Sequence, residues 1–270
     1  MDDLSGLCAV VTGASRGIGP GTADALAAEG MHLVLAARDA ERLEEVARGV
    51  SRRGVEVLPV PTDVRKEHDR AALVEAARNR FGRIDVLGNY AAIIEWKPFL
   101  EQDPEQIADI LHTNLTAALL LARAVLPEMV ARGSGHVVTM SSLEGKVGIS
   151  NTATYGASKA GLLIWNAALR SELQGTGVGL TAIAPGYVTE SGMWADVGAR
   201  APLLGGAVPP SRVAQAVVRA LRRNPQEIYV RSQPTTPLLS LIALRPELGG
   251  RLLKTFGVDR QMKQLFNRSG

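Results

Sequence analysis

A glycine-rich turn near the N-terminus limits the possible folds of this 270-residue chain more than any other feature. An apolar, β-branched run of strand length at 7–12 leads into the segment Gly-Ala-Ser-Arg-Gly-Ile-Gly at 13–19, and an alanine-rich helical pattern follows it. In a strand–turn–helix unit, Gly13 permits a tight turn, Gly17 lets the backbone approach a pyrophosphate, and Gly19 lets the helix pack closely on the sheet. The free N–H groups at the start of the helix then face the phosphates. The turn therefore predicts a dinucleotide site.

Strand and helix signals alternate along the rest of the chain, which predicts a parallel sheet with helices on both faces. The strand signals lie near 7–12, 32–36, 55–60, 84–88, 135–140, 178–184 and 227–230. With 46% hydrophobic residues the chain can bury one large core. We predict a single α/β domain over 1–230, a Rossmann-type doubly wound fold with about seven strands, and a helical C-terminal extension over 231–270.

A candidate proton-transfer set follows in the second half of the chain. Tyr155 and Lys159 are four residues apart in a predicted helix over 152–174, and Ser142 lies thirteen residues upstream of the tyrosine. Residues at i and i+4 share a helix face, and a nearby ammonium lowers the pKa of a phenol. A phenol with a lowered pKa can act as a general acid or base near neutral pH. The pair alone also fits a solvated helix face, but the glycine turn favours a site.

The glycine spacing Gly-x-x-x-Gly-x-Gly, together with Ser142, Tyr155 and Lys159, resembles the short-chain dehydrogenase/reductase family, in particular its classical branch. The resemblance runs over roughly residues 5–230. Further matching segments are Asp63-Val64, Asn114, Ser141-Ser142 and Pro185-Gly186. The resemblance implies an NAD(P)(H)-dependent oxidoreductase that acts on an alcohol/carbonyl pair, in which the cofactor carries the hydride and the protein supplies position and a proton.

The resemblance also implies roles for individual residues. Tyr155 would pass a proton to or from the substrate oxygen, and Ser142 would hydrogen-bond that oxygen. Lys159 would lower the tyrosine pKa and hold the nicotinamide ribose, and Asn114 would support a water linking the lysine to solvent. The expected cofactor-binding residues are Gly13, Ser15, Arg16, Gly17, Ile18, Gly19, Arg38, Asp63, Val64, Asn89, Ala91, Tyr155, Lys159, Pro185, Gly186, Val188 and Thr189. The four histidines have no metal-ligand spacing, so no metal site is expected.

The end of the second predicted strand bears on the choice of cofactor. An acidic residue there would bond the adenosine ribose and repel a 2′-phosphate, but Ala37 occupies that place and Arg38 follows it. Arg16 in the glycine turn is a second cation that could reach the same phosphate. NADP(H) is therefore favoured over NAD(H), although Asp39 could instead pair with Arg38.

Two segments depart from the family pattern. Where the family usually has Asn-Asn-Ala-Gly, this chain has Asn-Tyr-Ala-Ala at 89–92. We expect Tyr90 to be a packing residue, and Ala92 to be strained only if its φ is positive. Where the family often has a threonine that holds the carboxamide, this chain has Glu190, so Thr189 and the backbone of Val188 become the candidates.

The segment 190–210 corresponds to a mobile flap over the substrate in the family. It includes Met193, Trp194, Leu203 and Leu204, so we expect a substrate with hydrophobic bulk.

The net charge of +3 is too small to argue for nucleic-acid binding. Residues 231–270 hold seven basic and two acidic residues, a net of +5, which leaves −2 on the rest of the chain. We favour helices packing on the body or on a neighbouring subunit over a basic amphipathic patch at a membrane surface.

Other expectations concern location and assembly. We expect no secretory signal, no apolar run of membrane-spanning length and no disulfide, because Cys8 is the single cysteine. We also expect a cytoplasmic protein that forms a homotetramer or homodimer. As the resemblance implies, helices over roughly 105–131 and 152–174 would pair across a two-fold axis.

The predicted function is an NADP(H)-dependent oxidoreductase that interconverts a secondary alcohol and a ketone on a moderately hydrophobic small molecule. One alternative is a 3-oxoacyl-thioester reductase, whose acidic carrier protein would meet the basic tail. A different class is a nucleotide-sensing or scaffold protein, which would not need Asn114, Ser142, Tyr155 and Lys159 together.

Overall fold

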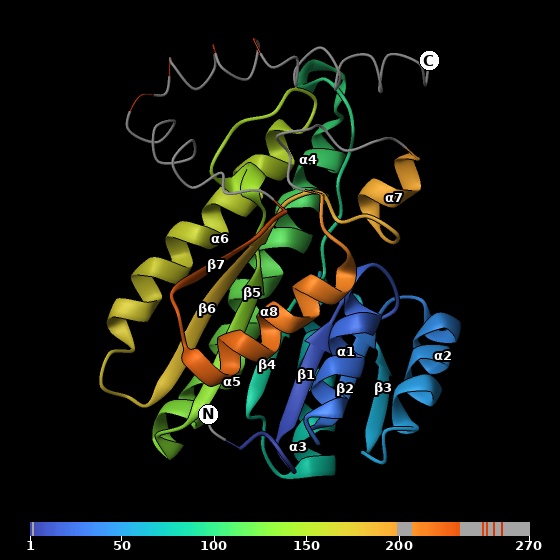
Figure 1. Cartoon of the computed structure of the whole chain (residues 1–270), viewed down its shortest axis with the longest axis vertical. Helices are drawn as coiled ribbons and strands as arrows, with labels where there is room; N and C mark the ends of the chain where they lie inside the picture. The colour runs from blue at the N-terminus through green and yellow to red at the C-terminus, as the bar shows by residue number, and fades with distance from the viewer. Residues whose placement is uncertain are drawn as a thin grey trace.

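The computed structural model describes residues 1, 3–198 and 207–232, and the single positions 245, 247, 251 and 255. Its centre is a seven-stranded sheet (Figure 1). The strands are β1 (Cys8–Thr12), β2 (His32–Ala37), β3 (Val57–Pro61), β4 (Val86–Asn89), β5 (Gly135–Met140), β6 (Val178–Pro185) and β7 (Glu227–Val230). All pairs are parallel, in the order β3-β2-β1-β4-β5-β6-β7. The predicted Rossmann-type doubly wound α/β fold is confirmed, with strand ends within two residues of the expected ones.

Helices cover both faces of the sheet (Figure 1). One face carries α1 (Ile18–Ala28), α2 (Ala40–Ser51) and α8 (Pro210–Arg223). The other carries α3 (Glu67–Phe81), α5 (Ala117–Arg132) and α6 (Ala153–Glu172), with α4 (Pro104–Leu111) packed against α6. The short helix α7 (Met193–Val197) follows β6. The C-terminal extension predicted for 231–270 lies almost wholly outside the described residues, so its helices and its packing stay predictions.

The apolar strands divide their side chains between two cores. Ala9 and Val11 of β1 join the core beneath α1, α2 and α8, whereas Cys8 and Val10 join the core beneath α3 and α5. Successive side chains of a strand point to opposite faces, so a strand covered on both sides must be apolar throughout.

One long helix differs from the sequence expectation. The helical stretch Pro104–Arg132 is by length and composition apolar enough to cross a membrane, and it is the single such helix among the residues that the structure describes. The expectation that no apolar run reaches this length was therefore wrong. Half of its most apolar window is buried inside the protein, and Leu121, Val125 and Met129 pack in the second core. These contacts account for its composition as that of a core helix.

The carboxyl ends of the parallel strands meet at one edge of the sheet. In open α/β sheets, ligands bind outside this edge where the strand order reverses. Here the order reverses between β1 and β4, so the glycine turn after β1 and the segment after β4 lie side by side.

Candidate functional site

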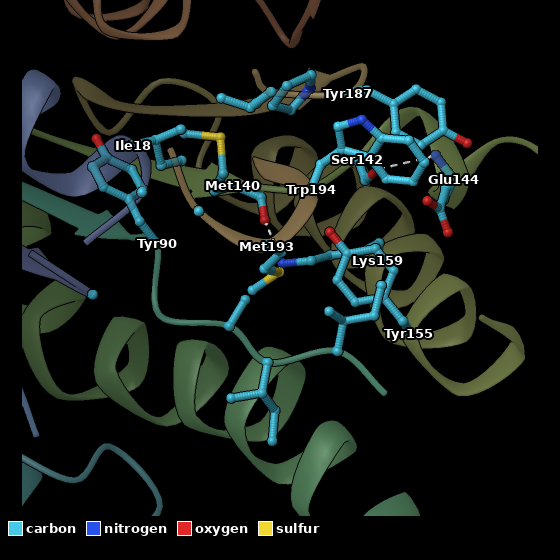
Figure 2. Close-up of a pocket in the computed structure, with 18 of the residues that line it drawn as sticks. Ile18, Tyr90, Met140, Ser142, Glu144, Tyr155, Lys159, Tyr187, Met193 and Trp194 are labelled. Atoms are coloured by element: carbon cyan, nitrogen blue, oxygen red, sulfur yellow. Dashed lines mark hydrogen bonds between the residues drawn. The ribbon is translucent and has the colours of Figure 1, made fainter. Parts of the chain in front are cut away.

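A cavity of about 760 Å³ opens at the carboxyl edge of the sheet. Its walls come from the glycine turn, the segments after β4, β5 and β6, helix α6 and helix α7. Figure 2 shows Ser142, Glu144, Tyr187 and Trp194 grouped toward one end, Tyr155 and Lys159 beside them, and Ile18 and Tyr90 toward the other end. Of the predicted site residues, the cavity is lined by Gly13, Arg16, Gly17, Ile18, Arg38, Ser142, Tyr155, Lys159, Pro185, Gly186 and Val188.

The glycine turn has the geometry of a phosphate cradle. Gly13 and Gly17 have φ of 68° and 64°, in the left-handed region that favours glycine. A Cβ on Gly13 would lie 2.9 Å from the Ala91 backbone, and a Cβ on Gly19 would lie 2.3 Å from the Gly13 carbonyl oxygen. Gly19 thus closes the turn on itself, whereas the sequence predicted contact with the sheet. The turn ends at the N-terminus of α1, so its N–H groups and shape fit a dinucleotide pyrophosphate.

Ser142, Tyr155 and Lys159 meet at the cavity as predicted from their spacing. Ser142 lies two residues after the end of β5, and its Oγ accepts a hydrogen bond of 3.1 Å from the Glu144 N–H. Lys159 lies on α6 one turn after Tyr155, and its Nζ is 5.4 Å from the centroid of the tyrosine ring. The same Nζ donates to the Met140 carbonyl oxygen at 2.9 Å (Figure 2).

The electrostatics of the pair differ from the sequence prediction. Burial raises the pKa of Tyr155, the Glu144 carboxylate raises it further, and a hydrogen bond to Ser142 opposes the rise. Burial also lowers the pKa of Lys159 to about 7, against the opposing charge of Glu144. The expected lowering of the tyrosine pKa by Lys159 is wrong for this structure. The reason is that burial disfavours the charged form of both groups, and this effect is the largest contribution to both pKa values.

Glu144 is a site residue that the sequence reasoning missed. It lies on the short helix η3 (Leu143–Gly145) and lines the cavity. Burial raises its pKa to about 7, while a hydrogen bond to Thr152 and the charge of Lys159 oppose the rise. The sequence does carry a signal, since Glu144 is an acidic residue two positions after the candidate serine.

Asn114 is buried inside a π-helical turn (His112–Thr116) between α4 and α5. Its Oδ1 accepts from the Ile93 N–H at 2.8 Å, and its Nδ2 donates to the Ile93 carbonyl oxygen at 2.9 Å. Nδ2 also donates to Ser158 Oγ at 3.1 Å. The amide therefore ties the segment after β4 to α6, next to the Tyr155–Lys159 pair. Single π-turns of this kind are frequent at functional sites.

Arg38 lines the cavity at the end of β2 and is exposed. Asp39 is engaged elsewhere, because it caps α2 through the Arg42 N–H at 3.1 Å and forms an ion pair with the Arg42 side chain at 3.4 Å. The alternative pairing of Asp39 with Arg38 is thus not the one observed. Arg16 forms an exposed ion pair with Asp196 of α7.

Several predicted cofactor residues are not among those that line the cavity. The Asp63 carboxylate is held by Arg65, which also pairs with Asp109, and this hydrogen bonding lowers the Asp63 pKa to about 2. Asn89 donates to the Ala118 carbonyl oxygen at 3.0 Å. The predicted residues outside the set that lines the cavity are Ser15, Gly19, Asp63, Val64, Asn89, Ala91, Asn114 and Thr189.

The two departures at 89–92 are accommodated without strain. Tyr90 is 5% exposed and packs in the core, where its ring fills the space beside Gly88. A Cβ on Gly88 would lie 2.7 Å from the Tyr90 ring. Ala92 does not have a positive φ, so its methyl group costs no backbone strain. The packing role predicted for Tyr90 agrees with its position.

Thr189 turns away from the cavity. Its N–H and its hydroxyl both donate to the Val208 carbonyl oxygen, at 2.9 and 3.3 Å. Glu190 follows with a φ of 70°, a conformation that is costly for a residue other than glycine. Val188 does line the cavity, so its backbone keeps the place predicted for it.

An aromatic wall closes one side of the cavity. The ring of Trp194 on α7 lies 4.4 Å from that of Tyr187 and 5.7 Å edge-on from that of Trp96, measured between centroids. The segment between β6 and α7 touches the glycine turn, since Ser191 Oγ donates to the Gly17 carbonyl oxygen at 3.0 Å. The start of the segment predicted to be a flap therefore lies against the glycine turn, and residues 199–206 of that segment lie outside the described residues.

Comparisons with known proteins agree with this geometry. Residues 7–201 match the family described as short chain dehydrogenase. The chain is 39% identical to the ketoacyl reductase HetN of Nostoc sp. over 99% of this chain and 96% of that protein.

Two solved structures are also similar. A metagenomic short-chain oxidoreductase in complex with NADP is 32% identical over 86% of this chain and all of that chain, with a TM-score of 0.75. A variant of the actinorhodin polyketide ketoreductase with NADPH is 32% identical over 86% of this chain and 98% of that chain, with a TM-score of 0.78.

Proposed function

The chain belongs to the short-chain dehydrogenase/reductase family and is an NAD(P)-dependent oxidoreductase. We propose that it uses NADP(H) to interconvert a ketone and a secondary alcohol on a moderately hydrophobic small molecule. The observation that carries the proposal is the meeting of Ser142, Tyr155 and Lys159 at one end of an apolar cavity. The aromatic wall of Trp96, Tyr187 and Trp194 supports a substrate with hydrophobic bulk.

The glycine turn, Arg38 and the backbone of Val188 would hold the cofactor, which would supply the hydride when bound. Tyr155 would then donate its phenolic proton to the carbonyl oxygen during reduction. Its raised pKa keeps the phenol protonated over the neutral range, so the proton is present for reduction, and a charged Lys159 beside it would make the phenol a stronger acid. Ser142 would hydrogen-bond the same oxygen and stabilise the negative charge that develops on it.

Lys159 and Asn114 would position this set. The Lys159 ammonium is anchored by the Met140 carbonyl oxygen, and Asn114 fixes the segment after β4 against α6. In the oxidative direction, an ammonium beside Tyr155 would favour the phenolate needed as a base. We propose that Lys159 is charged when it performs this role and that it also contacts the nicotinamide ribose.

NADP(H) is favoured over NAD(H) by the absence of an acidic side chain at Ala37 and by the exposed guanidinium of Arg38. Arg16 would contribute after leaving Asp196, since a phosphate can replace the carboxylate in a charge-assisted contact. The NADP and NADPH in the two similar structures support this choice.

A second candidate is the reduction of a 3-oxoacyl thioester. Its support is the name of HetN, a ketoacyl reductase, and that of the polyketide ketoreductase. The alignment with HetN extends over 99% of this chain and so includes the basic segment 231–270, the surface that would meet an acidic carrier protein. Both candidates use the same proton-transfer set. They differ in whether the substrate that enters the cavity is a free ketone or a 3-oxoacyl thioester on a carrier protein.

The experiment that separates the candidates follows NADPH oxidation by the purified protein with free ketones, aldehydes and 3-oxoacyl thioesters. We expect the highest kcat/KM with a hydrophobic free ketone and little turnover with NADH. A kcat/KM for 3-oxoacyl thioesters well above that of every free ketone would favour the second candidate. The absence of turnover with all classes would contradict both.

We also propose a homo-oligomer. Ile164 of α6 is 73% exposed and Leu120 of α5 is 42% exposed, so both helices present large apolar side chains on the surface of a single chain. Such exposed apolar positions on two helices that cover the same face of the sheet suit a two-fold interface.

A further inference from the structure

The cavity contains two buried polar atoms that the proposed proton transfer does not use. Glu144 Oε2 and Trp194 Nε1 are both buried, and neither has a hydrogen-bond partner within the described part of the chain. Both residues line the cavity, and Figure 2 shows them on the same side as Ser142. Buried polar groups in native proteins are nearly always paired, so an unpaired polar atom on a residue that lines a cavity points to a missing ligand.

Glu144 lies close to the place where a carbonyl would react. Its N–H donates to Ser142 Oγ, and its carboxylate acts electrostatically on Tyr155, Lys159 and Tyr187. A substrate oxygen held by Ser142 and Tyr155 would therefore place its neighbouring carbon near Glu144. Glu144 thus lines the cavity next to the proton-transfer set without being part of it.

The chemistry of the two atoms selects the kind of group they would bind. A carboxylate oxygen accepts a hydrogen bond and an indole N–H donates one. A hydroxyl group does both, so it suits a cavity that offers one acceptor and one donor. An ammonium group would also donate to Glu144, but it would meet the Lys159 side chain, a like charge whenever the lysine is protonated.

We propose that Glu144 is a specificity-determining residue that binds a hydroxyl group on the carbon next to the substrate carbonyl, with Trp194 Nε1 as a further donor to the substrate. The inference rests on the proposed function and narrows its substrate class to α-hydroxy ketones with an apolar remainder. The hydroxyl completes the hydrogen bonding of a buried carboxyl group, and a plain ketone leaves its Oε2 without a partner. Sites that bind a substrate hydroxyl discriminate strongly against analogues that lack it.

The test compares two ketones that differ in this hydroxyl alone, 2-hydroxyacetophenone and acetophenone, in NADPH-dependent reduction. We expect the wild-type protein to prefer the hydroxy ketone by roughly 10- to 100-fold in kcat/KM, the factor that a hydrogen bond to a charged group supplies. Glu144→Leu should abolish the preference, and Glu144→Gln, which keeps an acceptor oxygen, should retain part of it. Trp194→Phe should reduce the preference and retain the aromatic packing.

Outcomes that overturn the inference differ from those that overturn the proposed function. Equal kcat/KM for the two ketones in the wild-type protein, or an undiminished preference in Glu144→Leu, would overturn the role of Glu144 alone. Absence of turnover with these two ketones and with the whole panel of ketones, aldehydes and thioesters would contradict the proposed function, and wherever these two ketones are not turned over, binding decides the inference. In that case titration calorimetry should show 1-phenylethane-1,2-diol binding the wild-type protein at least 10-fold more tightly than 1-phenylethanol, a difference lost in Glu144→Leu. Equal affinities, or no binding of the diol, would refute it.

Discussion

Replacing Tyr90 with Phe isolates the packing role of a tyrosine that shares the cavity with Tyr155. The Tyr90 hydroxyl is buried and has no hydrogen-bond partner in the described part of the chain, and burial raises its pKa. A buried hydroxyl without a partner forfeits about 1–3 kcal/mol of hydration. Removal of the oxygen also leaves a small void beside Gly88, which opposes part of this gain. We therefore expect the free energy of unfolding to rise by about 1 kcal/mol, the lower end of the hydration range.

A gain of this size raises Tm by roughly 2–4 °C in a chain of this length. Urea unfolding should show a higher midpoint with an unchanged slope, because the surface exposed on unfolding is the same. The kcat/KM should stay within about three-fold of the wild-type value, since the hydroxyl performs no proton transfer. Tyr155→Phe is the matched control, because the same atom is removed from the same cavity.

Two results would refute this reasoning. A variant that folds normally but loses most of its activity would make Tyr90 part of the chemistry. A variant destabilised by about 1 kcal/mol or more would mean that the hydroxyl has a partner in the folded protein, in the range of one net hydrogen bond.

Three further predictions test other parts of the site. Arg38→Ala should weaken NADPH binding far more than NADH binding, and Ala37→Asp should shift preference toward NADH; titration of both cofactors checks this, and equal wild-type affinities would contradict it. The Glu144 pKa is raised to about 7 in the folded state, so the wild-type protein should lose free energy of unfolding as the pH rises from about 4.5 to about 7. Glu144→Gln lacks this loss and should therefore gain stability relative to the wild-type protein over the same window, which urea midpoints at pH 4.5 and pH 8 measure. Ile164→Asp should lower the mass measured by light scattering, whereas an unchanged mass would place the interface elsewhere.

The sequence predicted the fold because its signals are local and repeated. Each strand is apolar throughout, since both faces are covered, and each is followed by a helical pattern. The glycine turn and the Tyr155–Lys159 spacing are also local patterns. They predict the two ends of the site even when the packing of the core is unknown.

The rest of the site depends on contacts between distant segments, which no local pattern encodes. The Arg16–Asp196 ion pair joins the first loop to the flap, and Asp39 proved to serve as a helix cap. The tyrosine pKa was predicted in the wrong direction because spacing gives the distance to Lys159 but not the burial of both groups. Glu144 was missed because its burial and its place in the site depend on the distant segments that form the cavity around it.

The most direct test of the central claim is the rate of ketone-dependent NADPH oxidation by the purified wild-type protein and by Tyr155→Phe, with cofactor binding measured on both. We predict that the wild-type protein converts a hydrophobic ketone to the secondary alcohol. Tyr155→Phe should bind NADPH with nearly the same affinity and lose about 10²–10⁴-fold in kcat, the usual contribution of general acid catalysis. A Tyr155→Phe protein that reduces the ketone at close to the wild-type rate would contradict the account.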